Sequence, residues 1–123
     1  MVTGANSGVG FEVAQYLARR GAEVHLVCRS AKRGEEARQA MVAASGNSKV
    51  HLLVSDCSLE ADVRAAWAKF AQGKAAPRLD VLVCNAGVLL NELTLTPERV
   101  EVSFAYHPTP NPSPSPSPSP SPS

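Results

Sequence analysis

The sequence lacks three features, and each absence excludes a class of protein. No apolar run approaches the roughly 18 residues that span a bilayer. The first ten residues are broken by Gly4, Asn6, Ser7 and Gly8, so they lack the basic-then-apolar pattern of a signal peptide. Basic residues are not in excess, because 12 Lys and Arg face 11 Asp and Glu. We therefore expect no membrane span, no nucleic-acid partner and an intracellular location.

Close pairs of cysteine are also missing. Cys28, Cys57 and Cys84 are far apart and form no C-x-x-C motif. Each stands at or just after the end of an apolar, strand-like run. This arrangement favours three reduced, partly buried thiols over disulfides or a metal site, so we expect no metal ligands.

Proline is scarce before residue 108 and dense after it. Eight of the ten prolines lie in residues 108–123, mostly alternating with serine. A proline at every second position removes every second N–H donor and excludes both helix and central strand. We therefore expect one domain over residues 1–107 and a disordered Pro/Ser low-complexity tail over residues 108–123.

A glycine-rich turn dominates the start of the chain, in the stretch Thr3-Gly4-Ala5-Asn6-Ser7-Gly8-Val9-Gly10. Glycine lets the backbone turn tightly and approach a ligand closely. A helix after such a turn offers free N–H groups and the positive end of its dipole to a pyrophosphate. The pattern alone is a weak signal, because similar turns join strands and helices that bind nothing.

Apolar runs alternate with amphipathic segments along the rest of the chain. The pattern predicts strands at residues 24–28, 50–54 and 79–84. It predicts helices at residues 11–20, 31–45, 59–70 and 98–105, with Ser30, Ser58 and Thr96 as caps. Such alternation is typical of an α/β fold with a parallel sheet covered by helices on both faces. His25 and His51 fall inside strands and are interpreted as core residues.

Polar residues follow three of the expected strands, at the sheet edge where open α/β folds bind ligands. In a dinucleotide-binding fold, the residue at the end of the second strand contacts the adenosine ribose: an acid binds the 2′-OH of NAD, and an Arg accommodates the 2′-phosphate of NADP. This chain has Arg29 there and no acid. Arg29 is therefore either a 2′-phosphate ligand or a solvated strand-end Arg. Asp56 and Asn85 either face the ligand or only cap turns.

Together these motifs resemble the short-chain dehydrogenase/reductase (SDR) family over about residues 1–105. The motifs are Thr3-Gly4-x-x-x-Gly8-x-Gly10, Asp56 after one strand and Asn85-Ala86-Gly87 after another. Residues 25–29, 34–37 and 93–105 are similar to the retinol-dehydrogenase-like branch. The resemblance implies a Rossmann-type doubly wound parallel sheet with three α/β/α layers, truncated here to the N-terminal half of the domain. It also implies hydride transfer between NAD(P) and a carbonyl or alcohol.

The resemblance assigns roles in cofactor binding residue by residue. It implies that the pyrophosphate and adjoining ribose contact the turn, that Arg29 selects NADP over NAD, and that the adenine contacts Asp56 and Cys57. The loop after the last strand lines the cofactor and braces the central strand. The expected cofactor-binding residues are Gly4, Asn6, Ser7, Gly8, Val9, Gly10, Arg29, Asp56, Cys57, Asn85, Ala86 and Gly87.

The chain departs from the family at both ends. Only Met1 and Val2 precede the turn, and after Phe104-Ala105 the sequence continues as Tyr106-His107-Pro108. The catalytic Ser and the Tyr-x-x-x-Lys pair have no counterpart, so we expect no catalytic residue and no activity in this chain. The substrate is undefined, although full-length relatives can oligomerise. Two alternatives are a non-catalytic NADP-binding or interaction module and an unstable truncated product without function.

Overall fold

A computed structural model describes residues 1–88 and 90–106 of the chain. The expected tail lies outside these residues. The described part contains a three-stranded parallel sheet in the order β1-β2-β3. The strands are β1 (Val2–Thr3), β2 (Val24–Cys28) and β3 (Val50–Val54), and the last two are those that the sequence predicts.

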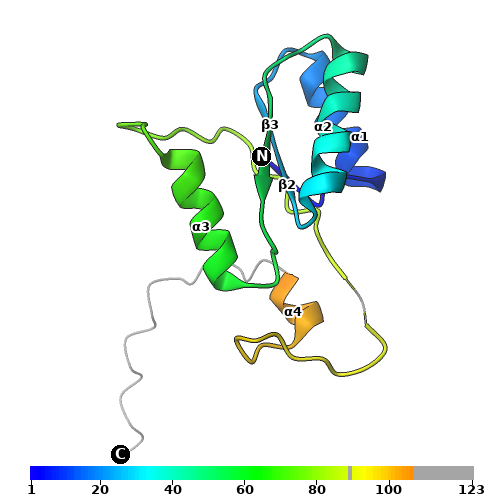
Figure 1. Cartoon of the computed structure of the whole chain (residues 1–123), viewed down its shortest axis with the longest axis vertical. Helices are drawn as coiled ribbons and strands as arrows, with labels where there is room; N and C mark the ends of the chain where they lie inside the picture. The colour runs from blue at the N-terminus through cyan, green and yellow to red at the C-terminus, as the bar shows by residue number, and fades with distance from the viewer. Residues whose placement is uncertain (89, 107–123) are drawn as a thin grey trace, which may run out of the picture.

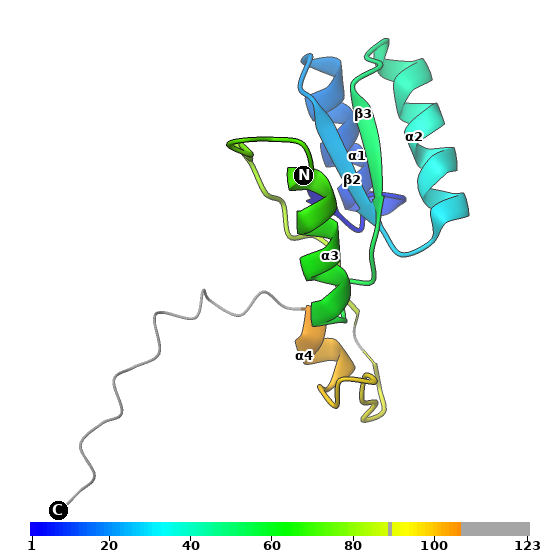
Figure 2. The same ribbon diagram turned by 60° about the vertical axis from the view of Figure 1, so that its left-hand side comes forward.

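Helices cover both faces of this sheet. Helices α1 (Gly8–Arg19) and α2 (Ala31–Ser45) lie on one face, and α3 (Glu60–Ala71) lies on the other, as Figures 1 and 2 show. A short helix, α4 (Val102–Tyr106), follows a long loop. The expected α/β fold with a Rossmann-type parallel sheet is thus confirmed.

Side chains alternate across β2 and feed two separate cores. Val24, Leu26 and Cys28 face α1 and α2, where they pack with Met41 and Val50. Val27 faces the other way and packs with Leu53 and Phe70 under α3. Because β2 is buried on both faces, it reads as a nearly continuous apolar run in the sequence.

The prediction of a strand at residues 79–84 is wrong, because these residues form no regular strand. Only Val83 pairs with the sheet, in an isolated parallel bridge to Val2. Thr3 donates its N–H to the carbonyl of Val83 at 3.0 Å, and Val83 donates to the carbonyl of Met1 at 2.9 Å. The physical reason is that β1 has only two residues, so it offers a very short ladder to its neighbour.

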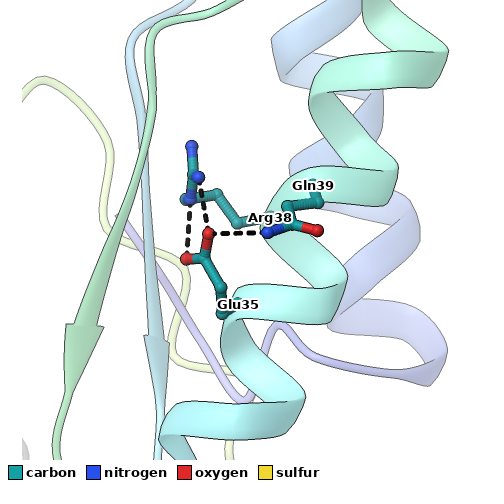
Figure 3. Close-up of polar contacts among 3 residues, drawn as sticks. All are labelled: Glu35, Arg38 and Gln39. Atoms are coloured by element: carbon teal, nitrogen blue, oxygen red, sulfur yellow. Dashed lines mark hydrogen bonds and ion pairs between the residues drawn. The ribbon is translucent and has the colours of Figure 1, made fainter.

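Local rules place the ends of α2 correctly. Ser30 accepts a hydrogen bond from the N–H of Arg33 at 3.2 Å, and Gly46 ends the helix with φ of 69°. On its polar face, Glu35 accepts hydrogen bonds from Arg38 and Gln39 (Figure 3). These hydrogen bonds lower the pKa of Glu35 to about 2, and the bond from Arg38 has the largest effect.

The cap of α3 comes from a distant part of the chain. Ser58, the expected cap, instead hydrogen-bonds to Asp56. The carboxylate of Glu98 accepts from the N–H groups of Glu60 and Ala61 at 2.6 and 3.1 Å. Residues 96–99 form a turn rather than the expected helix start, and α4 begins only at Val102.

The two histidines expected in the core are more exposed than predicted. Both lie on the face of the sheet that carries α3, where Phe70 of α3 packs edge-on against His25, and His25 is half-buried while His51 is exposed. Two aromatic side chains are also partly exposed. Tyr16 is 56% exposed, with the guanidinium of Arg20 over its ring, and Trp67 is 46% exposed. Among the described residues, no helix is both long and apolar enough to cross a membrane.

Candidate functional site

The glycine turn joins β1 to α1 and leaves the start of that helix open. Gly4 and Gly8 have φ of 63° and 58°, values that side chains other than glycine rarely adopt. A Cβ on Gly8 would meet no atom within 4 Å. Ser7 stands at the N-cap, but its side chain makes no capping hydrogen bond. The first N–H groups of α1 therefore need another acceptor, and an anion suits that position.

Asn85 fastens the turn to the neighbouring loop. Its side-chain Nδ2 donates to the carbonyl oxygens of Thr3 and Gly4, both at 3.2 Å. The Thr3 hydroxyl accepts in turn from the N–H groups of Asn85 and Ala86, at 3.1 and 3.0 Å. These bonds cross more than 80 residues of sequence and hold the turn rigid.

Two glycines make this close approach possible. A Cβ on Gly4 would lie 2.9 Å from the Cα of Ala86. A Cβ on Gly10 would collide with Nδ2 of Asn85 and would lie 2.5 Å from the carbonyl oxygen of Gly4. Gly10 is buried, so its role in the fold is to let α1 pack against the turn.

A cavity of about 310 Å³ opens between the glycine turn and the loop at Asn85. It lies at the carboxyl edge of the sheet, where the sequence predicts a ligand site. Eight of the twelve expected residues line it: Gly4, Asn6, Ser7, Arg29, Cys57, Asn85, Ala86 and Gly87. Gly8, Val9, Gly10 and Asp56 are not among the lining residues. Gly8 and Val9 are exposed at the start of α1 beside it.

Asp56 serves local structure in this arrangement. Its Oδ1 accepts from the N–H of Ser58 at 2.9 Å, from the Ser58 hydroxyl at 2.6 Å and from the Tyr106 hydroxyl at 3.3 Å. Burial raises the pKa of Asp56, but these hydrogen bonds and the charge of Arg29 outweigh it and lower the pKa below its ordinary value. Asp56 therefore caps the turn at Ser58.

Cys57 lines the cavity as an unreactive thiol. Burial first, and then the charge of Asp56, raises the pKa of Cys57 to about 11. A thiol with so high a pKa is protonated at neutral pH and is a poor nucleophile. Cys57 can therefore contact a ligand by packing, but it is not poised for covalent chemistry.

Sequence reasoning missed three lining residues, Val27, Ser55 and Tyr106. Ser55 is 4% exposed, and its hydroxyl is a buried side-chain atom without a hydrogen-bond partner among the described residues. A buried hydroxyl that lines a cavity and lacks a partner is suited to bind a polar ligand. The sequence position of Ser55 could have indicated a place in the site, since Ser55 directly follows β3 just as Arg29 directly follows β2. Tyr106 reaches Asp56 from 50 residues away, which no local pattern predicts.

These residues fit a dinucleotide in three respects. The start of α1 offers free donors to phosphate, Arg29 brings a positive charge to the rim, and Ser55 offers an unused hydroxyl inside. The first turn of α1 contains no acidic residue that would repel an anion.

Comparisons with known proteins agree with this geometry. The family model described as "short chain dehydrogenase" matches residues 1–106. The chain is 41% identical over 105 residues to dehydrogenase/reductase SDR family member 12 from Bos taurus, covering 85% of this chain and 32% of that protein. It is 39% identical over 107 residues to retinol dehydrogenase 12 from Bos taurus, covering 85% of this chain and 33% of the relative. The chain thus spans about a third of the length of the curated relatives that it matches.

A solved structure shares the fold. A short-chain dehydrogenase from Sphingobium yanoikuyae in complex with NADPH superimposes with a TM-score of 0.68 and 29% sequence identity. The match covers 85% of this chain and 41% of that protein.

Proposed function

The chain is a member of the short-chain dehydrogenase family, and from that premise we propose that the cavity at the carboxyl edge of its sheet binds NADP(H) in preference to NAD(H). The observation that carries the proposal is the uncapped start of α1 beside a cavity whose rim includes Arg29. The Sphingobium yanoikuyae dehydrogenase with a similar fold was solved with NADPH, which supports a nicotinamide dinucleotide as the ligand.

The pyrophosphate binds at the glycine turn in this proposal. Gly4, Asn6 and Ser7 line the cavity, and the N–H groups of Gly8, Val9 and Gly10 stand at the start of α1. The open space beside Gly8 leaves room for phosphate oxygens to approach the backbone. The positive end of the helix dipole favours the negative charge there.

Arg29 distinguishes the two dinucleotides. Its exposed side chain lines the cavity directly after β2, where the adenosine ribose lies in a Rossmann fold. A guanidinium binds the 2′-phosphate of NADP by charge-assisted hydrogen bonds, and NAD has no such group. Cys57 packs beside the adenine, Asp56 holds the loop around it, and Asn85, Ala86 and Gly87 line the remaining wall.

For the whole protein that such relatives represent, we propose hydride transfer between NADP(H) and a carbonyl or alcohol. The bound cofactor supplies the hydride, and a Tyr with a Lys four residues on would move the proton. In this sequence neither tyrosine has a Lys four residues later: Arg20 stands four residues after Tyr16, and Pro110 stands four residues after Tyr106. We therefore expect the 123-residue chain to bind the cofactor without turnover.

Isothermal titration of the full chain with NADPH and with NADH tests the proposal. We expect NADPH to bind more tightly, and Arg29→Ala to weaken NADPH about 10- to 100-fold, the value of a charged hydrogen bond. NADH binding should change little. Arg19→Ala, at the far end of α1, is the matched control and should bind like the original chain. Equal affinities for both dinucleotides, unaffected by Arg29→Ala, would contradict the choice of NADP.

A further inference from the structure

We propose that Glu23, His25 and His51 form a binding site for a divalent transition-metal ion of the zinc class. One ligand atom from each of these residues lies within 4.8 Å of the other two. The group lies at the opposite end of the strands from the proposed cofactor cavity, and no residue belongs to both. The site is therefore separate from the proposed dinucleotide site and does not depend on it.

The register of the sheet brings the three side chains together. His25 on β2 pairs directly with His51 on β3, so both rings project from the same face. Glu23 precedes His25 by two residues and reaches that face as well. Nε2 of His51 lies 3.0 Å from Oε1 of Glu23, and the two imidazole rings stack with centroids 4.7 Å apart.

The donor set suits zinc. Two imidazole nitrogens and one carboxylate oxygen are ligands that Zn²⁺ prefers, and water can complete a four-coordinate shell. In a tetrahedral site with bonds of about 2.0–2.1 Å, ligand atoms stand roughly 3.4 Å apart. The ligand atoms therefore need only small side-chain rotations to close on an ion. The side chains of His51 and Glu23 are 47% and 57% exposed, so they are free to make them.

The surroundings give access and hold one ligand in place. Glu23 and His25 line a second cavity, of about 410 Å³, which leaves room for the ion and its water. The ring of Phe70 packs edge-on against His25 at 4.8 Å and orients it. Lys74 opposes the ion, since its ammonium lies over Phe70 at 3.7 Å and lines the same cavity.

Titration of the full chain with Co²⁺ and Zn²⁺ tests the site. We expect one ion per chain, with Co²⁺ showing ligand-field bands but no thiolate charge-transfer band, because the ligands are nitrogen and oxygen. Zn²⁺ should compete with Co²⁺ and raise the Tm by roughly 10 to 20 °C at a hundredfold excess over its Kd, because it binds only the folded chain.

Three variants separate the site from alternatives. His51→Gln removes one ligand at an exposed position and should weaken binding at least tenfold, with an unchanged circular dichroism spectrum. Lys74→Gln should tighten binding, since it removes an opposing charge. His107→Gln should change nothing. Binding that is absent in the original chain, or equal in His51→Gln, would overturn the proposal and leave the three residues as an ion pair and a ring stack only.

Discussion

At the residue scale, Gly10 shows how one missing side chain shapes the site. It is buried where α1 meets the glycine turn, and a Cβ there would collide with the Asn85 amide that fastens the turn. The absence of a side chain at Gly10 therefore lets α1 pack against the glycine turn. Gly10 affects ligand binding only indirectly, because this packing holds the turn in place.

Gly10→Ala should lower the free energy of unfolding by about 1 to 3 kcal/mol, the usual cost of overpacking a closely packed site. Chemical denaturation followed by circular dichroism measures it. Gly87→Ala is the matched control, because its added Cβ would meet only the carbonyl oxygen of Asn85, at 3.9 Å. Equal effects of the two substitutions would contradict the packing argument.

The carboxylate of Asp56 gives a prediction of pH dependence. Its pKa is lowered in the folded chain, so the unfolded chain binds the proton more readily. Its contribution to stability is therefore present above the unfolded value of about 3.8 and is lost as pH falls through the folded value. Ser58, Tyr106 and Arg29 are the groups that stabilise the charged form.

Asp56→Asn should accordingly destabilise the chain at neutral pH, and its difference from the original chain should shrink as pH falls below about 3.8. Denaturation midpoints measured from pH 7 to pH 3 follow the trend. A difference that stays constant over this range would show that the charge of Asp56 does not stabilise the fold.

At the element scale, α3 depends on a contact from Glu98, which lies 38 residues after Glu60 in the sequence. Glu98 accepts from the first N–H groups of α3 and places a negative charge at the positive end of its dipole. The helix has no side-chain cap of its own, because Leu59 occupies the N-cap position.

Glu98→Ala should therefore cost about 1 kcal/mol of stability, as loss of an N-cap does. Glu98→Gln should recover part of it, since an amide oxygen still accepts a hydrogen bond. Thermal unfolding monitored at 222 nm, the usual helix signal, would compare both with Glu92→Gln, which removes an exposed charge in the same loop. A Glu98→Ala variant as stable as the control would show that α3 needs no such cap.

The elements also show which parts of the fold follow from local sequence. Helix α2 spans Ala31–Ser45 as predicted, with Ser30 as its cap, because capping depends on residues within one turn. The cap of α3 was mispredicted at Ser58, since Glu98 lies 38 residues from Glu60. The strand at residues 79–84 was mispredicted because pairing depends on the length of its partner, which β-propensity does not reveal.

The same distinction applies to the candidate site. The glycine turn, Arg29 and Asn85 follow from their positions after strands, because parallel strands bring their carboxyl ends to one edge. Ser55 and the Tyr106–Asp56 contact were missed, since neither belongs to a recognisable motif. The alignment of His25 with His51 depends on the sheet register, which was available only from the structure.

At the scale of the whole molecule, the edge of the sheet beyond β1 is open among the described residues, where only Val83 forms a bridge to Val2. Val81 and Leu82 are 53% and 52% exposed beside the bridge to β1, and Val63 and Trp67 are each 46% exposed on α3. Apolar side chains next to unpaired backbone favour association with another chain.

The chain should therefore self-associate as its concentration rises, which sedimentation velocity measures. Leu82→Lys should reduce the association, because a charge at a strand edge opposes pairing. Leu93→Lys is the control, since Leu93 is 82% exposed in the loop before α4. Association that is absent, or that both variants reduce equally, would contradict a role for the open edge.

The most direct test of the account is an NMR titration of the ¹⁵N-labelled chain with NADPH. Binding at the proposed cavity predicts saturable shifts of the amides of Gly4, Ser7, Gly8, Arg29 and Ala86, and unchanged amides at Glu23 and His51. If millimolar NADPH left the first group unmoved, or shifted residues far from the cavity instead, the glycine turn of this chain would not be a dinucleotide site.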